Sequence, residues 1–264
     1  MPNRKYNTLI YKITNDIARV TLNRPEVHNA FNDEMLSELI EVFGELHGLG
    51  TKVRAVVITG EGKSFCAGAD INWMRKMVDY SYEENIEDSN LIADCMYALY
   101  NLPQPTISRV NGAAIGGGMG LVTAADIAIA VDTAQFSLSE VKIGVIPACI
   151  SPYVIMRAGP AACREFFLTG ERLTAEKALS YRLINQVAAA AELDNAVDER
   201  IKQLKSSGPE ALAACKKLIR DVYMMSLEDA KPYTVKMIAD LRASAEGQEG
   251  MRAFLEKRKP KWSE

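Results

Sequence analysis

Histidine is scarce in this sequence, although it is a residue that enzymes often use for catalysis and metal binding. Only His28 and His47 occur among the 264 residues. Neither stands in a G-x-S-x-G context or at metal-ligand spacing from a second candidate ligand, so we expect neither a catalytic triad nor a metal site. His47 falls at the end of a predicted helix, where the simplest expectation is a solvated side chain.

The cysteines lack the pattern of a disulfide framework or a zinc site. There are five of them, Cys66, Cys95, Cys149, Cys163 and Cys215, and no two form a C-x-x-C pair. The odd number and wide spacing favour small buried residues in a reducing compartment, which predicts a cytoplasmic location. The first fifteen residues mix charges with isolated apolar residues, so no signal peptide is expected.

Long apolar runs and a strong net charge are also lacking. The longest uncharged stretch, residues 110–125, has 16 residues and is rich in glycine, whereas a membrane-spanning helix needs about 20 apolar residues. The net charge is −3 and the pI is about 5.6. A nucleic-acid-binding protein usually has a basic surface. We therefore expect a soluble protein with neither a membrane nor a nucleic acid as its partner.

Strand patterns are confined to the first 190 residues. Runs rich in β-branched residues predict strands over 9–13, 17–22, 54–59, 106–110 and 126–131. The first two runs meet at Thr14-Asn15-Asp16, a cluster typical of a turn, so we expect a hairpin there. Strands and helices do not alternate with the even spacing of a doubly wound sheet. A mixed α/β core is therefore predicted.

Helical patterns occur along the whole chain, and after residue 190 they occur without any strand pattern. In the core, helices are predicted after Asn32, after Asp70 and over 90–101. Asn32 is the expected N-cap of the first of these helices, whose apolar face includes Met35, Leu39, Val42 and Leu46. In the rest of the chain they are predicted over 191–205, 209–223, 227–241 and, after a break at Gly247 and Gly250, 251–259. We therefore divide the chain into a core, residues 1–190, and a C-terminal helical region, residues 191–264.

Two segments combine small residues with the start of a predicted helix. Residues 64–71 read SFCAGADI and residues 111–120 read NGAAIGGGMG. Small side chains leave peptide N–H groups uncovered, and such groups at a helix start attract anions. Two such turns facing each other would make an oxyanion hole; tight packing against strands is the alternative. No G-x-G-x-x-G spacing and no complete P-loop is present, so phosphate binding of the nucleotide type is not expected.

Together with three further blocks, these segments resemble a known family. NRP at 23–25, QFSLSEVKIG at 135–144 and the tail GMRAFLEKR at 250–258 complete the pattern. In order and spacing the blocks resemble the enoyl-CoA hydratase/isomerase (crotonase) family, over nearly the whole chain. The resemblance implies a crotonase-like α/β fold with repeated ββα units, a β-spiral core and a C-terminal helical oligomerisation region. It also implies an acyl-CoA thioester substrate, no cofactor beyond the coenzyme A of that substrate, and a homotrimer or homohexamer.

The resemblance also assigns roles to single residues. The N–H groups of Ala69 and Gly117 would hold the thioester oxygen as it becomes an enolate, and Glu140 would transfer the proton at the α-carbon. The backbone contacts that it implies for coenzyme A come from Val27, His28, Ala67, Asp70 and Ile71. Phe254 and Lys257 match tail positions that reach the CoA phosphate of a neighbouring subunit, although a solvated charge explains Lys257 equally well.

Two departures from the family pattern stand out. Its hydratases typically carry a second glutamate that activates water, and Gly120 stands at that position, which leaves a vacancy. Residues 146–152 read IPACISP where many relatives have a glycine-rich turn, so the floor of the acyl pocket should differ. Another group must then orient the water. The candidates are Ser139, or a second carboxylate on the substrate held by Lys142, Arg75 or Arg157, each of which is otherwise a solvated cation.

Residues 68–77 and 139–147 resemble the bacterial methylglutaconyl-CoA hydratase branch, which serves leucine degradation and whose substrates carry a second carboxylate. Trp73, Met74 and Met77 could line the acyl pocket, although their helical spacing is equally typical of core residues. The sequence therefore predicts an enzyme of fatty acid metabolism that hydrates a short or branched α,β-unsaturated acyl-CoA. Isomerisation between Δ3 and Δ2 double bonds, thioester hydrolysis, decarboxylation and a non-catalytic oligomer subunit are the alternatives.

Overall fold

The hairpin predicted near the start of the chain opens the main sheet. The computed structural model describes residues 5–263; in it β1 (Leu9–Thr14) pairs antiparallel with β2 (Ile17–Leu22). Asn15 and Asp16 between them have φ angles of 51° and 64°. A two-residue hairpin loop of this kind requires positive φ at both positions, which Asn and Asp tolerate better than most residues. The predicted turn is confirmed.

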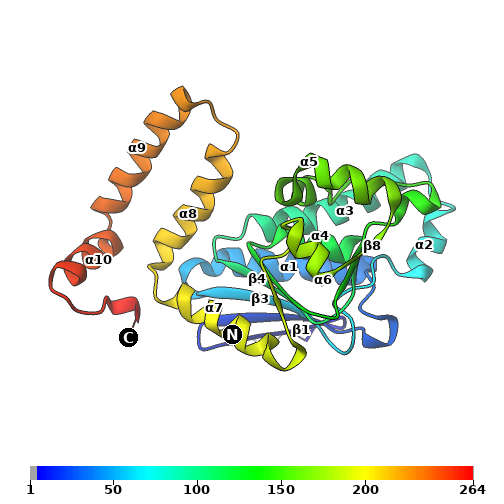
Figure 1. Cartoon of the computed structure of the whole chain (residues 1–264), viewed down its shortest axis with the longest axis horizontal. Coiled ribbons are helices and arrows are strands. Elements are labelled where there is room, and N and C mark those ends of the chain that lie inside the picture. Colours follow the sequence, from blue (N-terminus) through cyan, green and yellow to red (C-terminus); the bar gives the residue numbers. More distant parts are fainter. Residues whose placement is uncertain (1–4, 264) are drawn as a thin grey trace.

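Parallel pairing extends this hairpin into a six-stranded sheet of order β1-β2-β3-β4-β6-β9 (Figure 1). The added strands are β3 (Ala55–Gly60), β4 (Thr106–Val110), β6 (Ile127–Val131) and β9 (Gln186–Ala188). Most residues of β3 are buried on both faces, as is usual in parallel sheets. The strands predicted at 54–59, 106–110 and 126–131 are confirmed to within one residue.

The sequence patterns do not predict a second sheet, which has three short strands. It consists of β5 (Ala114–Ile115), β7 (Gln135–Ser137) and β8 (Arg172–Thr174), in that order. With two or three residues each, these strands, like β9, are too short to show a period of two in the sequence. This small sheet joins the two segments at 111–120 and 135–144, since β5 pairs with β7.

The helices of the core cover the sheets and begin where the sequence provides caps. They are α1 (Asp33–Leu49), α2 (Ile71–Met77), α3 (Tyr82–Tyr100), α4 (Gly117–Ala124), α5 (Ser151–Thr169) and α6 (Ala175–Ser180). Although α7 (Leu193–Lys205) falls in the predicted C-terminal helical region, it packs on the same core through Leu193, Ala196, Val197 and Ile201. The Asn32 side chain accepts from the Met35 amide at 2.9 Å, so Asn32 caps α1 as predicted. The predicted apolar face of α1, which includes Met35, Leu39, Val42 and Leu46, is buried in the core.

The third core helix begins eight residues earlier than predicted, at Tyr82 instead of residue 90. Ser81 and Glu84 form a capping box, in which each side chain accepts a hydrogen bond from the other residue's amide. The first turns of α3 are polar and exposed, so they carry no apolar stripe from which the helix could be recognised.

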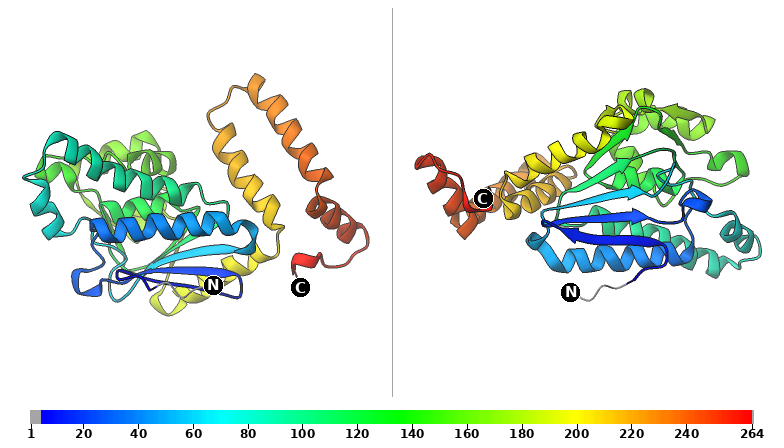
Figure 2. Two further views of the ribbon diagram at one scale, coloured as in Figure 1. Left: turned by 180° about the vertical axis from the view of Figure 1, so that it is seen from behind. Right: turned by 90° about the horizontal axis from the view of Figure 1, so that it is seen from below.

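After the core, three helices form an arm, residues 209–255, that extends to one side of the molecule (Figure 2). They are α8 (Pro209–Val222), α9 (Leu227–Ala243) and α10 (Ala245–Leu255). Two cations of α8 attach the arm to the core: Lys216 bonds to Asp126 at 2.6 Å, and Arg220 donates to Asn101 at 2.5 Å. A cavity of about 630 Å³, lined by Tyr100 and Tyr153 among others, separates α8 from the core.

The break predicted at Gly247 and Gly250 is wrong, because both residues lie inside α10. Ser244 caps this helix by accepting from the Gly247 amide at 3.0 Å. A Cβ on Gly250 would lie 2.9 Å from the Trp262 ring, and one on Gly247 would collide with the Leu241 carbonyl. These glycines therefore allow close packing within a helix and do not end it.

The cysteines follow their expected burial only in part. Cys66, Cys95 and Cys163 are buried, whereas Cys149 is half-buried and Cys215 on α8 is exposed. Within residues 5–263, no helix has the length and apolar character needed to cross a bilayer.

Candidate active site

The two glycine-containing turns predicted to face each other are in contact. Gly68 and Gly116 have φ angles of 93° and 51°, in the region that glycine adopts most readily. A Cβ on Gly68 would lie 3.2 Å from the Ile115 carbonyl oxygen and 3.9 Å from the Gly116 Cα. A bridge between Cys66 and Ala114 fixes this approach, because the Ile115 amide donates to the Cys66 carbonyl at 2.9 Å.

The backbone around Ala69 leaves the amide of that residue free. Phe31 forms a parallel bridge with Ala69: the Phe31 amide donates to Gly68, and the Asp70 amide donates to Phe31, both at 2.7 Å. In such a bridge the hydrogen bonds come from the two neighbours, and the N–H of the bridged residue points to the opposite side. No backbone acceptor for the Ala69 amide occurs in the described part of the chain.

Gly117 is the first residue of α4, so its N–H group has no partner within the helix. The preceding amide, of Gly116, donates to the Ser137 carbonyl at 2.9 Å. A Cβ on Gly117 would lie 2.5 Å from Cε2 of the Phe31 ring. Phe31 therefore supports both turns, with its backbone at Ala69 and its ring beneath Gly117. The sequence patterns do not indicate this role, because a buried phenylalanine is ordinary.

Glu140 opens a short 3₁₀ helix, Glu140–Ile143, beside these turns. Its Oε1 lies 3.2 Å from the position that a Cβ on Gly116 would occupy, so the carboxylate is next to the turn that precedes Gly117. Its Oε2 is buried and has no hydrogen-bond partner among residues 5–263. Burial raises the pKa of the Glu140 carboxyl above its usual range, against a smaller opposing effect of its own backbone amide. This is the environment of a general acid–base group.

The vacancy expected at Gly120 is filled. A Cβ on Gly120 would lie 2.5 Å from Cγ2 of Ile150 and 3.1 Å from Sδ of Met96. Ile150 belongs to residues 146–152, the second segment that departs from the family pattern. The two departures from the family pattern, Gly120 and residues 146–152, are therefore parts of one packing arrangement. In it, Ile150 occupies the space beside Gly120, which has no side chain.

The residues predicted to contact coenzyme A through their backbone are brought together, and their roles stay predictions. The Ala67 amide donates to the His28 carbonyl at 3.0 Å, which places residues 27–28 beside residues 67–71. Asp70 caps α2 by accepting from the Asn72 amide at 2.8 Å, and its carboxylate pairs with Arg24 at 2.7 Å. Burial opposes ionisation of Asp70, but these hydrogen bonds outweigh it and lower the pKa.

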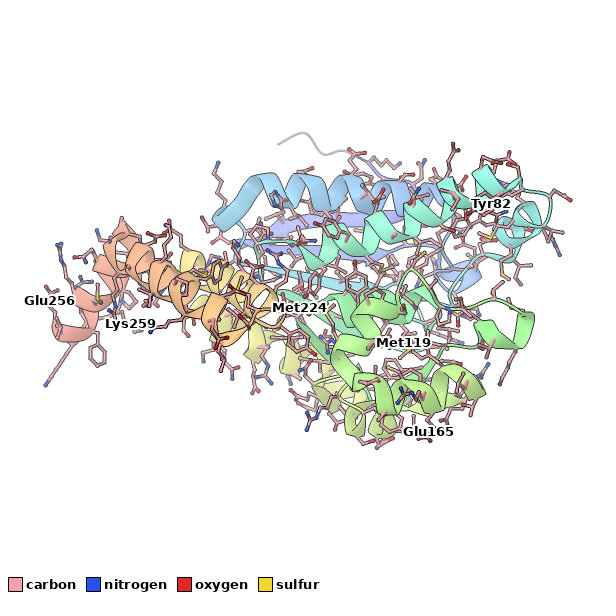
Figure 3. The ribbon with its side chains drawn as sticks, turned by 90° about the horizontal axis from the view of Figure 1, so that it is seen from above. Tyr82, Met119, Glu165, Met224, Glu256 and Lys259 are labelled. Carbon is pink, nitrogen blue, oxygen red and sulfur yellow. The ribbon has the colours of Figure 1, made fainter. Side chains whose placement is uncertain are left out.

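Phe254 and Lys257 are not brought to this site within one chain. Phe254 is at the end of α10 and Lys257 follows it, and both side chains are exposed. Figure 3 shows their neighbours Glu256 and Lys259 at the far end of the arm, well away from Met119 of α4. A role for them at a CoA site therefore requires a second subunit and stays a prediction.

Of the three cations considered for a substrate carboxylate, Arg157 is excluded by its contacts. Its guanidinium donates to the carbonyls of Thr123, Ala125, Asp126 and Leu183 at 2.6–3.1 Å. It closes the C-terminal end of α4, and its donors are used for contacts within the chain. Arg75 is exposed and bonds to Asn72 at 3.0 Å, while Lys142 is exposed with its aliphatic part against Gly170.

The three apolar residues proposed for the acyl pocket differ in burial. Trp73 is buried, and Met74 and Met77 are half-buried. The Trp73 indole donates to Asp88 at 2.9 Å.

Ser139, the other candidate for orienting the water, is half-buried. It precedes the short helix that begins at Glu140, but in the described structure its side chain makes no capping hydrogen bond to that helix. Among residues 5–263, no group of three or more His, Cys, Asp or Glu side chains could hold a metal ion.

Known proteins are similar to this chain in fold and in sequence. The sequence model of the family described as enoyl-CoA hydratase/isomerase matches residues 12–264. The crystal structure of an enoyl-CoA hydratase from Shewanella pealeana is 40% identical, with a TM-score of 0.94 over 98% of this chain and 97% of that one. A putative enoyl-CoA hydratase of Thermus thermophilus is 32% identical over 93% of this chain and 97% of its own length. A trans-2-decenoyl-[acyl-carrier-protein] isomerase of Streptococcus mutans is 28% identical over 98% of both.

Proposed function

This chain belongs to the enoyl-CoA hydratase/isomerase family and has its crotonase fold, and we propose that it hydrates a short or branched α,β-unsaturated acyl-CoA. The observation that carries the proposal is the half-buried Glu140, whose buried Oε2 has no hydrogen-bond partner within residues 5–263. It lies beside two turns whose Ala69 and Gly117 amides have no backbone acceptor in the same range. Such a site suits a thioester whose carbonyl oxygen gains charge during the reaction.

The bonds that form and break in this reaction involve only the substrate, water and the Glu140 carboxylate. The thioester oxygen accepts hydrogen bonds from the Ala69 and Gly117 amides, which become stronger when the oxygen carries the negative charge of an enolate. Water attacks the β-carbon and forms the new C–O bond while one of its protons passes to the Glu140 carboxylate. Glu140 then returns that proton to the α-carbon, the enolate reverts to a thioester, and one water has been added across the double bond.

A substrate with a second carboxylate, such as methylglutaconyl-CoA, is the finer part of the proposal. Its support is the resemblance of residues 68–77 and 139–147 to that branch. With Arg157 committed to carbonyl groups, Arg75 and Lys142 are the remaining candidate cations for such a carboxylate. The test compares kcat/KM for methylglutaconyl-CoA and crotonyl-CoA. Equal values would mean that the substrate's second carboxylate contributes nothing.

Isomerisation between Δ3 and Δ2 double bonds is the second candidate function. It is favoured by the Gly120–Ile150 packing, because one carboxylate suffices to move a proton between the α- and γ-carbons. The absorbance of the conjugated enoyl thioester distinguishes the two reactions. Hydration of a 2-enoyl-CoA lowers this absorbance, whereas isomerisation of a 3-enoyl-CoA raises it. An enzyme that acts only in the second direction would contradict the hydratase proposal.

The acid side of the pH profile should reflect Glu140. Because the carboxylate must be ionised to accept a proton from water, kcat/KM should fall as the pH drops through the Glu140 pKa, which burial raises above its usual value. We expect the midpoint to lie above about 4.3, the ordinary value for glutamate. Circular dichroism over the same range would show that the fold persists. A profile that stays flat down to pH 4 in a folded protein would contradict this prediction.

The arm should assemble with other copies of the chain, as a homotrimer or homohexamer. Large apolar side chains on it are exposed in the single chain, among them Tyr223, Met224, Leu227 and Phe254. Apolar groups of this size usually become buried in an interface. Light scattering should therefore give several times the mass of one chain.

In the assembled enzyme, Lys257→Ala should raise KM for acyl-CoA with little change in kcat, because Lys257 is predicted to reach the CoA phosphate of a neighbouring subunit. Lys236→Ala, on the exposed side of α9, is the control. An active monomer would contradict both expectations.

A further inference from the structure

Hydration requires that the attacking water be oriented, and Glu140 and the two free amides do not fully provide this. The inference that follows rests on the proposed hydratase function. The attacking water has two hydrogens, and Glu140 takes only one of them. The other hydrogen needs an acceptor if the oxygen is to point at the β-carbon. Position 120 cannot supply it, because Gly120 has no side chain and Ile150 fills the adjoining space.

One carboxylate outside the predicted set is held close to the first turn of α2, directly after Ala69. Trp73 lies in that turn and is buried. Its indole Nε1 donates to Oδ1 of Asp88 on α3 at 2.9 Å. This bond fixes the carboxylate, while Oδ2 has no hydrogen-bond partner among the described residues. Asp88 is half-buried; Trp73 holds its Oδ1, and its Oδ2 remains available as an acceptor.

The residue next to Asp88 contacts the segment that covers Gly120. The carbonyl of Ser89 accepts from the thiol of Cys149 at 3.5 Å. Ile150 follows Cys149 and rests on Gly120, in the first turn of α4. Asp88 is therefore linked by two short chains of contacts to the starts of both helices that follow the facing turns. These contacts connect the neighbour of Asp88 to Ile150, the residue that covers Gly120.

The electrostatic surroundings of Asp88 resemble those of Glu140. Burial raises the pKa of Asp88; the bond from Trp73 opposes this rise, and the charge of Asp33 adds to it. In the described part of the chain, the other carboxyl groups with a shifted pKa, such as Asp221 and Glu249, are lowered by hydrogen bonds in which a lysine or arginine takes part. A carboxylate that is desolvated and has no cationic partner is suited to a polar ligand or water.

We propose that Asp88 positions the attacking water. Its free Oδ2 accepts a hydrogen bond from the hydrogen that the water retains, and Trp73 holds the carboxylate in place through Oδ1. No proton passes to Asp88: the water gives one proton to Glu140 and its hydroxyl to the β-carbon, as in the proposed reaction. The carboxylate on α3 thereby replaces one that the first turn of α4 lacks.

The test uses two reactions of the intact enzyme. Hydration needs the positioned water, whereas exchange of the α-hydrogen of a saturated acyl-CoA with deuterium oxide needs only Glu140 and the two amides. Asp88→Asn keeps the acceptor for the Trp73 indole but replaces the free acceptor by an N–H donor. We expect it to lower kcat for hydration by about 10²-fold, the effect of a misplaced reactant, with KM and α-hydrogen exchange within about twofold of the wild type.

Matched variants separate this role from a structural one. Glu87→Gln changes an exposed carboxylate on the same helix and should leave both reactions unchanged. Trp73→Phe removes the indole donor and should slow hydration in the same direction as Asp88→Asn. Equal loss of hydration and exchange in Asp88→Asn, or no loss of either, would overturn the proposal. If the wild type exchanges α-hydrogens but hydrates no enoyl-CoA, the hydratase function itself is wrong, and that outcome is visible before any variant is made.

Discussion

Replacing Glu140 by glutamine should lower kcat for hydration by about 10²–10⁴-fold, the usual contribution of a general acid–base group. Glutamine has the same shape but cannot accept the proton from water or return it to the α-carbon. Because Oε2 is buried and has no hydrogen-bond partner within residues 5–263, the ionised carboxylate is poorly solvated at neutral pH. The neutral amide should therefore leave the thermal stability unchanged or slightly higher.

Steady-state kinetics, binding of a non-reactive acyl-CoA and a thermal melt together check this expectation. KM and affinity should stay near wild type, because in the proposed mechanism the Ala69 and Gly117 amides hold the thioester oxygen and Glu140 does not. Glu176→Gln, an exposed change on α6, is the control and should alter nothing. Retention of more than a tenth of the wild-type kcat in Glu140→Gln would show that another group transfers the proton.

Introducing the family's glutamate at position 120 should damage the protein and not improve it. A Cβ there would lie 2.5 Å from Ile150 Cγ2 and 3.1 Å from Met96 Sδ, in a wholly buried place. Overpacking of this kind typically costs about 1–3 kcal/mol, and a carboxylate buried without a partner adds to that cost. We expect Gly120→Glu to lower the free energy of unfolding by more than about 2 kcal/mol and to hydrate crotonyl-CoA more slowly.

The reason for this loss can be tested with two further variants. If Ile150 is the obstacle, Gly120→Glu combined with Ile150→Gly should recover part of the stability that Gly120→Glu alone loses. Gly44→Glu is the matched control, because Gly44 is an exposed helical glycine with open space around it. It should be neutral or stabilising, since glutamate is the better helix former. Chemical denaturation of the four proteins measures the differences, and a stable, faster Gly120→Glu would contradict this packing argument.

Local chemistry makes much of the fold predictable. The Asn15-Asp16 turn, the Asn32 cap and the apolar face of α1 all depend on short stretches of sequence, and the structure has them where those stretches predict them. The start of α3 is harder to recognise, because its first turns are polar and exposed and only its capping box marks it. The glycines of α10 resemble a break in the sequence, because the residues that they approach most closely, Leu241 and Trp262, lie outside this helix.

In the candidate site, too, some residues can be recognised from the local sequence and others cannot. The Ala69 and Gly117 turns can be recognised from small residues at helix starts, and Glu140 from the family resemblance. Phe31, which supports both turns, is an ordinary apolar residue in the sequence, and Asp88 is an ordinary surface acid. Their places depend on contacts between distant segments. For the same reason the carbonyl contacts of Arg157 cannot be foreseen from its neighbours in the chain.

The two isolated bridges, Phe31 with Ala69 and Cys66 with Ala114, also bear on the order in which the molecule folds. Each joins segments that are far apart in sequence, so it can close only after α1, β3 and β4 have docked. Contacts of this kind are slow to form, because the entropy of closing a long loop must be lost first. The Ala69 and Gly117 amides, which we propose hold the thioester oxygen, are therefore expected to come together late in folding. A partly folded chain would contain its helices and strands and still have no affinity for an acyl-CoA, so ligand binding should be among the last signals to return during refolding.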